Sequence, residues 1–208
     1  MTSIQISPFH ISTKRIRNGT KKTVYYPQVA LIGNKAWEFQ INRIIRDQVR
    51  GMIGTQSGDT PSLVEEMFGF YEIKNNQRNV LSLSLSNYSY YNGAAHGMTI
   101  IKSLTFDFVK KKLCTLQDLF IPGSNYVERI SKLIQIQIEQ RDIPLLEDFT
   151  SINPNQPFYI ADKSLVIYFQ LYEITSYAVG FPMFPISVFD LQDLIDENSP
   201  LARMAVNS

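Results

Sequence analysis

Cysteine and histidine are scarce in this sequence, with one Cys and two His among 208 residues. The single thiol, Cys114, excludes an internal disulfide framework and a four-thiolate zinc site. His10 and His96 are far apart in the chain, and no HxxxH or CxxC spacing occurs, so the sequence predicts no metal site. A glycine loop that leads into a helix and could cradle a phosphate is also missing, so we expect no cofactor.

Strong charge and long apolar runs are absent as well. The formal net charge is +1, too weak to gather phosphate backbones, so we expect no nucleic-acid partner. Because no run of about 18 apolar residues occurs, we expect no transmembrane segment. The first residues, MTSIQISPFHISTKRIRNG, lack the pattern of a signal peptide, so the chain as written is expected to be cytoplasmic or spore-associated.

Apolar residues are plentiful. They make up 44% of the chain, and 12% of the residues are aromatic, which is typical of a globular protein and not of a disordered one. A chain of this length buries roughly 70% of the surface that its unfolded form exposes. Its core therefore needs neither disulfides nor a metal.

Hydrophobic periodicity divides the chain into strands and two principal helices. Segments 4–16 and 23–33, joined by the turn signal Asn18-Gly19, predict a hairpin. A helical apolar face follows at about 35–52, with Asn34 placed to cap its start. The later expected elements are strands at 63–74, 78–91 and 98–109, a helix at 125–140, a hairpin formed by 158–161 and 165–174, and a strand at 184–189. The second strand of this hairpin is expected to be central in its sheet.

Together these elements predict an α+β fold, a mostly antiparallel sheet with two principal helices packed on it. The loop GTQSGDTPS, residues 54–62, is the clearest break in the chain. It is expected to separate an N-terminal hairpin-plus-helix subdomain, residues 1–60, from a C-terminal α+β domain, residues 61–208. Both are expected to pack as one compact unit.

Two finer predictions concern burial. In the strand at 98–109, Thr105 and Asp107 share the polar parity, and the alternation predicts one dry face and one polar face. Cys114 lies among alternating leucines, and we expect it to be a partly buried structural thiol.

The stretch SNYSYYNGAAHGMT, residues 86–99, contains Tyr88, Tyr90, Tyr91 and His96. In a structural interpretation the NGAAHG segment is a tight connection between strands, with glycines at positive φ and the imidazole bonded to a backbone carbonyl. In a functional interpretation the small residues let a ligand approach the backbone, while His96 and the tyrosines contact it. Both interpretations stay open on the sequence.

The segment YAVGFPMFP, residues 177–185, allows the same two interpretations. It is either a loop that covers the core or the rim of a groove, in which case Tyr177 and Phe181 would contact the ligand. Nucleophilic catalysis has no support, because no GxSxG elbow is present. A carboxylate pair for sugar hydrolysis, including Glu173 or Asp162, remains open because folding could bring such residues together.

Five short segments carry a family resemblance. They are YYPQVALIGNKAWEFQIN, YYNGAAHG, TLQDLF, FYIADKSLVIYFQLYEI and SYAVGFPMFPI, which occur in this order between about residues 23 and 195. In that order they resemble the paired domains of unknown function found in the extracytoplasmic part of a lysozyme-sensing anti-sigma factor of Bacillus-type bacteria. The same domains occur beside the catalytic domain of a peptidoglycan deacetylase.

The resemblance implies a non-catalytic module that binds a cell-envelope target, either a peptidoglycan-type glycan or a protein such as lysozyme. His96 with its flanking glycines, and Tyr177, Ala178 and Gly180, lie on the family motifs. A net charge of +1 is a poor match for the strongly basic lysozyme, so glycan binding ranks first.

The leading hypothesis is therefore a binding module in which six residues contact a glycan, and it has two rivals. A protein-interaction or sensory module for an envelope or spore-associated partner is the first alternative, and a glycan hydrolase is the second. The predicted ligand-binding residues are Tyr88, Tyr90, Tyr91 and His96 on one wall of a groove, and Tyr177 and Phe181 on the other.

Overall fold

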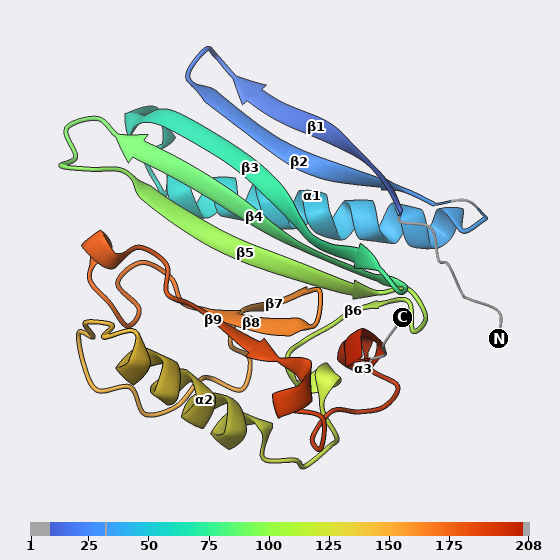
Figure 1. The fold of residues 1–208 in the computed structure, drawn as a ribbon. Helices are drawn as coiled ribbons and strands as arrows, with labels where there is room; N and C mark the ends of the chain where they lie inside the picture. The colour runs from blue at the N-terminus through green and yellow to red at the C-terminus, as the bar shows by residue number, and fades with distance from the viewer. Residues whose placement is uncertain (1–8, 32, 206–208) are drawn as a thin grey trace. The chain divides into compact units, whose positions relative to one another are not determined.

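The structure is a computed structural model that describes residues 9–31 and 33–205. Its elements follow one another as Figure 1 labels them. They are β1 (His10–Asn18), β2 (Lys22–Ala30), α1 (Lys35–Ser57), β3 (Val64–Gln77), β4 (Val80–Tyr91), β5 (Met98–Asp107), β6 (Lys112–Leu113), α2 (Tyr126–Gln140), β7 (Phe158–Ala161), β8 (Ser164–Tyr168), β9 (Met183–Ser187) and α3 (Pro200–Ala205).

The strands form two sheets, one of six strands in the order β1 to β6 and one of three in the order β7-β8-β9. The predicted α+β class is thereby confirmed, and β8 is central in its sheet as expected. Pairing is mostly antiparallel, with one exception: β2 pairs with β3 in parallel over the register Lys22↔Met67 to Val24↔Gly69. The hairpin that the sequence predicts at the start of the chain is β1-β2, and the part of it at 4–8 lies outside the described residues.

Packing divides the chain into two compact units. The first comprises Met1–Ile73 and Leu83–Leu104, and the second comprises Lys74–Ser82 and Thr105–Ser208. These boundaries differ from the predicted division at residue 60, because β3, β4 and β5 each carry residues of both units. The domain division predicted from the sequence stays a prediction.

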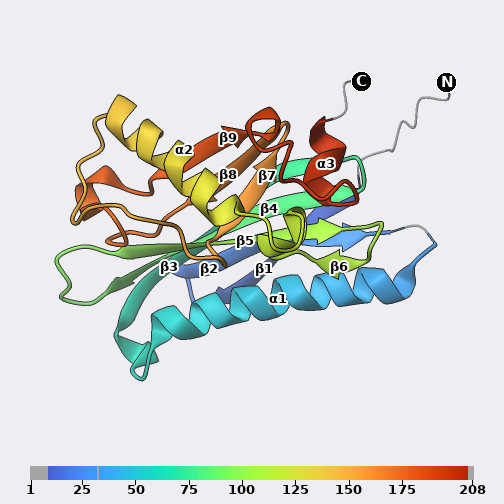
Figure 2. The same cartoon turned by 90° about the horizontal axis from the view of Figure 1, so that it is seen from below.

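In the first unit, α1 packs its apolar face on the β1-β2 hairpin, and Figure 2 shows it running along these strands. The Asn34 side chain caps the helix by accepting a hydrogen bond from the Trp37 amide at 3.2 Å. Asn42 fixes the helix to β2, because its amide both accepts from the N–H and donates to the carbonyl of Val29, each at 2.8 Å. The buried side chains of α1 are Trp37, Ile41, Ile45, Val49, Met52 and Gln56.

The helix α1 ends at Ser57, past the predicted end near residue 52. Gly51 and Gly54 both lie inside the helix. The buried Gln56 explains the extension, since its amide donates to the Met98 carbonyl at 2.8 Å and accepts from the Asn87 amide at 2.7 Å. Tertiary hydrogen bonds thus outweigh the low helix propensity of two glycines.

In the second unit, α2 packs on the three-stranded sheet (Figures 1 and 2). Its core face includes Tyr126, whose ring stacks on Phe120 with centroids 4.6 Å apart. Gln137 and Arg141 extend from the same helix and donate to the carbonyls of Pro185 and Met183 at 2.9 and 2.8 Å. The helix is therefore held to β9 by both packing and hydrogen bonds.

The prediction that the strand at 98–109 has one dry face and one polar face is wrong at the C-terminal end of the strand. Thr105 and Asp107 are buried, at 2% and 0% exposure. The Thr105 hydroxyl is 2.8 Å from that of Ser82, which accepts the Ile160 N–H at 2.9 Å. Asp107 accepts from Arg203 at 2.7 Å. Thr105 and Asp107 can be buried because each of them has a hydrogen-bond partner.

Within residues 9–31 and 33–205, no helix is both long enough and apolar enough to cross a membrane.

Replacing Asn34 by Ala should lower the free energy of unfolding by about 1 kcal/mol, because the Trp37 amide loses its capping acceptor. Urea denaturation followed by circular dichroism measures the change. Asn125→Ala is the matched control, since Asn125 is the N-cap of α2 and makes no side-chain capping hydrogen bond. Equal losses in both variants would contradict the capping role of Asn34.

Candidate functional site

The predicted tyrosine and histidine segment forms the connection between β4 and β5. Gly93 has φ +83°, as a tight turn requires. His96 is exposed, and its Nδ1 lies 3.0 Å from the Gly97 carbonyl oxygen. Tyr90 donates to the Ala94 carbonyl at 3.1 Å, and Tyr91 donates to the Gln56 carbonyl at 2.6 Å. These contacts match the structural interpretation, while ligand contact by the segment stays a prediction.

Gly97 is required by packing in this connection. It is buried, and a Cβ built on it would lie 2.2 Å from the Tyr88 ring. The small residue therefore makes room for the neighbouring tyrosine. No ligand is needed to explain why a glycine stands at this position.

The other predicted contacts, Tyr177 and Phe181, belong to the second unit, whereas Tyr88, Tyr90, Tyr91 and His96 belong to the first. Tyr177 begins a 3₁₀ turn, Tyr177–Val179, and is exposed, while Phe181 is half-buried. The Tyr177 ring lies beside that of Tyr172, with centroids 5.8 Å apart and an interplanar angle of 35°. The groove with two walls stays a prediction, and the structure brings together Tyr177 and Tyr172.

A cavity of about 440 Å³ lies in the second unit and includes Tyr172 in its lining. Its size is within the range of small-ligand pockets, roughly 300 to 1,000 Å³. The loop before β7 forms one side, and the segment after β8 forms the other. The lining residues are Leu146, Glu147, Asp148, Phe149, Thr150, Ser151, Asn153, Gln156, Phe169, Tyr172, Glu173 and Ile174.

The three carboxylates of this cavity have different roles. Glu173 is occupied by hydrogen bonds within the protein, since one oxygen accepts from the side-chain amide of Gln156, in the loop before β7, at 3.0 Å and the other from the Gln170 N–H at 2.6 Å. Glu147 and Asp148 are exposed, and neither has a hydrogen-bond or ion-pair partner among the residues that the structure describes. Two carboxylates are thus available to a ligand, and one organises the loop.

Sequence reasoning singled out Tyr177 and Glu173 but missed the loop before β7. The loop has no periodic pattern and no motif of its own. Glu147, Asp148 and Phe149 all line the cavity, but three consecutive residues of a loop carry no spacing from which that could be predicted.

Two of the carboxylates considered for hydrolysis, Asp162 and Glu173, lie on opposite sides of β8 in the chain. Asp162 occupies the β7-β8 turn with φ +48°, ahead of β8, whereas Glu173 follows that strand. Five strand residues span roughly 16 Å at 3.3 Å each. Glycoside hydrolysis needs two carboxyl groups within about 5 to 9.5 Å. Asp162 and Glu173 therefore cannot act together on one glycosidic bond.

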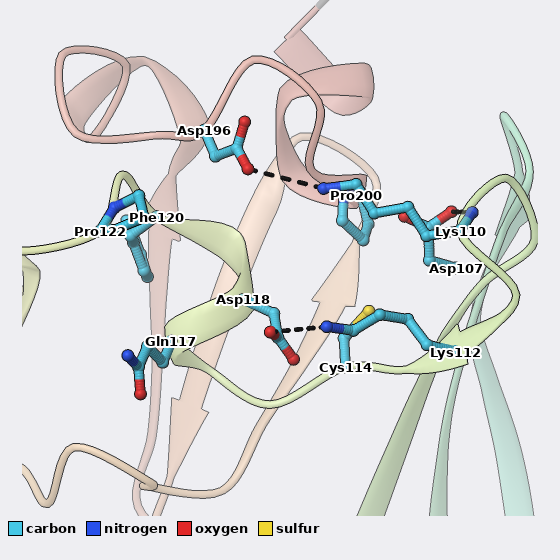
Figure 3. Close-up of a pocket in the computed structure, with 10 residues that line it drawn as sticks. All are labelled: Asp107, Lys110, Lys112, Cys114, Gln117, Asp118, Phe120, Pro122, Asp196 and Pro200. Atoms are coloured by element: carbon cyan, nitrogen blue, oxygen red, sulfur yellow. Dashed lines mark hydrogen bonds and ion pairs between the residues drawn. The ribbon is translucent and has the colours of Figure 1, made fainter.

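A second cavity, of about 170 Å³, is bridged by two ion pairs (Figure 3). The Lys112 ammonium lies 2.7 Å from Asp118, and that of Lys110 lies 3.5 Å from Asp196. Burial raises the pKa of Asp118, but hydrogen bonds from Lys112 and from the amide and hydroxyl of Thr115 outweigh it and hold the pKa below its ordinary value of 3.8. The polar groups here mostly satisfy one another.

Cys114 also lines the second cavity, and the prediction of a structural thiol is confirmed. The residue is buried, at 7% exposure. Burial raises the pKa of its thiol to about 12, and the nearby charges of Asp107 and Asp118 act in the same direction. The thiol is therefore protonated at neutral pH and is a poor nucleophile.

No cluster of three or more His, Cys, Asp or Glu with the arrangement of a metal site occurs among residues 9–31 and 33–205.

Residues 117–188, which include α2, β7, β8 and β9, match the family described as a protein of unknown function (DUF3298). Over 134 residues the chain is 23% identical to the peptidoglycan-N-acetylmuramic acid deacetylase PdaC of Bacillus subtilis strain 168. This alignment covers 61% of the chain and 28% of PdaC, so the chain spans less than a third of that protein.

Two solved structures of the DUF3298 family share the fold. One is from Bacteroides fragilis NCTC 9343, with a TM-score of 0.70 and 12% identity, and covers 97% of this chain and 99% of its own. The other is from Pseudomonas aeruginosa PAO1, with a TM-score of 0.69, 13% identity and the same coverage. The predicted resemblance to the domain beside a peptidoglycan deacetylase is confirmed, and that to the lysozyme-sensing protein stays a prediction.

Replacing Gly97 by Ala should destabilise the protein by about 1 to 3 kcal/mol, because the new methyl group overlaps the Tyr88 ring. Urea denaturation measures the loss. Gly51→Ala is the control, since a Cβ at Gly51 meets nothing within 4 Å, and it should be neutral or stabilising. Unchanged stability of Gly97→Ala would show that the connection is not held by this contact.

The Cys114 thiol should react very slowly with a disulfide reagent in the folded protein. A pKa of about 12 against an ordinary 9.0 leaves roughly a thousandfold less thiolate at neutral pH. Absorbance after addition of Ellman's reagent, with and without urea, measures this rate. A Cys114→Ser protein with Ser62→Cys, which places the thiol at an exposed position, should react quickly when folded. Fast native reaction at Cys114 would contradict its burial.

Proposed function

We propose that the chain is a non-catalytic binding module for a peptidoglycan-type glycan at the cell envelope. The observation that carries the proposal is the cavity of about 440 Å³, which has the exposed Tyr172 in its lining. The ring of Tyr177 lies beside that of Tyr172, with centroids 5.8 Å apart. A pair of adjacent aromatic rings beside a polar cavity suits sugar rings, which present one apolar face and several hydroxyl groups.

Polar groups around the cavity suit the hydroxyls of such a ligand. Thr150, Ser151 and Asn153 lie in the lining and can donate or accept hydrogen bonds. The apolar side chains of Phe149 and Phe169 stand beside them, with ring centroids 5.9 Å apart. Ligand sites commonly combine aromatic walls with a few convergent polar groups in this way.

The comparison with PdaC supports a wall polymer as the target, because that relative is a peptidoglycan-N-acetylmuramic acid deacetylase. The aligned portion is 28% of PdaC, so its activity is not transferred to this chain. Binding without catalysis fits Glu173, because both of its carboxylate oxygens accept hydrogen bonds from other residues of the protein.

The other five predicted ligand-binding residues stay in the proposal as residues that contact a glycan. Tyr88, Tyr90, Tyr91 and His96 lie near the β4-β5 connection, where His96 is exposed and the three tyrosines are half-buried. Phe181 follows the turn that begins with Tyr177. Each of these side chains is proposed to contact a glycan within its own unit, the first four in the first unit and Phe181 in the second.

A basic protein partner is a second candidate function. It is favoured by the free carboxylates of Glu147 and Asp148, which make this region locally acidic although the whole chain carries +1. A basic partner such as lysozyme would meet complementary charge here. Titration with lysozyme, in which binding weakens as salt is added, tests this candidate.

Replacing both Tyr172 and Tyr177 by Ala should reduce retention on insoluble peptidoglycan about tenfold, since each aromatic contact contributes roughly 0.5 to 1.5 kcal/mol. Co-sedimentation of the purified protein measures the bound fraction, and thermal unfolding should change little because both rings are exposed. Phe189→Ala, which removes an exposed aromatic side chain outside the cavity, is the matched control.

Retention of the wild-type protein that survives high salt would support stacking as the main contact. Loss of binding in Phe189→Ala to the same extent would contradict a role specific to the cavity. Absence of wild-type retention on peptidoglycan, together with tight binding of lysozyme, would replace the glycan proposal by the protein partner.

A further inference from the structure

The cavity beside Tyr172 has an unbalanced charge. Its lining includes Glu147, Asp148 and Glu173, and no lysine, arginine or histidine. Glu173 is hydrogen-bonded to Gln156 and to the Gln170 N–H. The carboxylates of Glu147 and Asp148 have no such partner in the described part of the chain. A ligand in this cavity therefore meets two carboxylates whose charge no neighbouring cation neutralises.

The aromatic side of the cavity also favours a cation. Ring faces attract cations that lie within about 6 Å of their centroids, and the Tyr172 and Tyr177 rings are 5.8 Å apart. An ammonium group beside Tyr172 would thus interact with both the ring faces and the carboxylates.

We propose that this cavity binds amino sugars that carry a free, protonated amine more tightly than their N-acetylated forms. The inference rests on the proposed glycan function, and it names the substituent that the site distinguishes. The sugar ring packs on Tyr172, and the ammonium group donates hydrogen bonds to Glu147 and Asp148. An N-acetyl group at the same place carries no charge and cannot form these ion pairs.

Acidic side chains also attract basic proteins and metal ions, but the cavity's dimensions favour an amino sugar over both. A volume of about 440 Å³ accommodates one or two sugar rings, whereas a protein partner needs an interface of about 800 Å² on each side. A divalent metal ion would need several oxygen ligands converging within about 2.6 Å, and no cluster of that kind occurs among the described residues.

The test compares two glycans with the full-length protein. A chitooligosaccharide of four to six sugars is used in its fully N-acetylated and its fully deacetylated form. Isothermal titration calorimetry at about pH 6, where most of the sugar amines are protonated, gives the two dissociation constants. We expect the deacetylated form to bind about tenfold more tightly, because charged hydrogen bonds are roughly twice as strong as neutral ones.

The decisive variant is Glu147→Gln with Asp148→Asn. It should bind the two glycans equally, since the amides keep the size and polarity of the side chains but not their charge. Asp190→Asn with Glu197→Gln is the control, because it removes the same charge from exposed positions outside the cavity lining. This control should retain the tenfold preference.

The outcomes distinguish the amine preference from the proposed glycan binding on which it rests. Equal binding of both glycans by the wild-type protein would overturn the amine preference and leave glycan binding intact. Binding of neither glycan would overturn both. A preference that persists in Glu147→Gln with Asp148→Asn, or that disappears in the control, would show that the charge acts from elsewhere and would overturn the assignment to this cavity.

Discussion

The buried side-chain amide of Gln156 is the interaction on which the proposed site depends. It donates to the Tyr168 carbonyl at 3.1 Å and to Glu173 at 3.0 Å, and its oxygen accepts from the Asn153 N–H at 3.3 Å. One side chain thereby ties the loop before β7 to the segment after β8. Because Gln156 is only 3% exposed, water cannot replace these bonds without opening the loops. The cavity lies between the two segments that this amide joins.

Buried polar side chains also form hydrogen bonds in the interior of the second unit. Ser82 bonds the Thr105 hydroxyl and accepts the Ile160 N–H, so a polar pair is satisfied where apolar residues would be expected. Asp107 and Arg203 form a comparable contact near α3, at 2.7 Å. Buried polar contacts of this kind add little net stability, but they penalise any arrangement in which the partners separate. They therefore specify which strands and loops meet.

The sequence allowed prediction of the elements whose signal is local. The apolar face of α1, its cap at Asn34 and the central position of β8 all follow from spacing within one segment. The end of α1 did not follow, because Gln56 is anchored by Asn87 and Met98, which lie more than thirty residues away. The burial of Thr105 was missed for the same reason, since its partner is on another strand. Tyr177 was found through its motif, whereas its neighbour Tyr172 became apparent only when folding brought the two rings together.

The charge of the cavity shows why composition is a weak guide to a ligand. A net charge of +1 sums over the whole surface, but a bound ligand responds to charges within about one Debye length, roughly 8 Å at physiological salt. The lining of the cavity includes Glu147, Asp148 and Glu173 and no lysine, arginine or histidine. The net charge favours a glycan over a basic protein as the ligand. The local charge adds a second property, because the same free carboxylates that could attract a basic protein also favour a sugar amine in a glycan site. The discriminating property is then the shape of the acidic surface, and a concave cavity beside two tyrosine rings suits a ring-sized ligand.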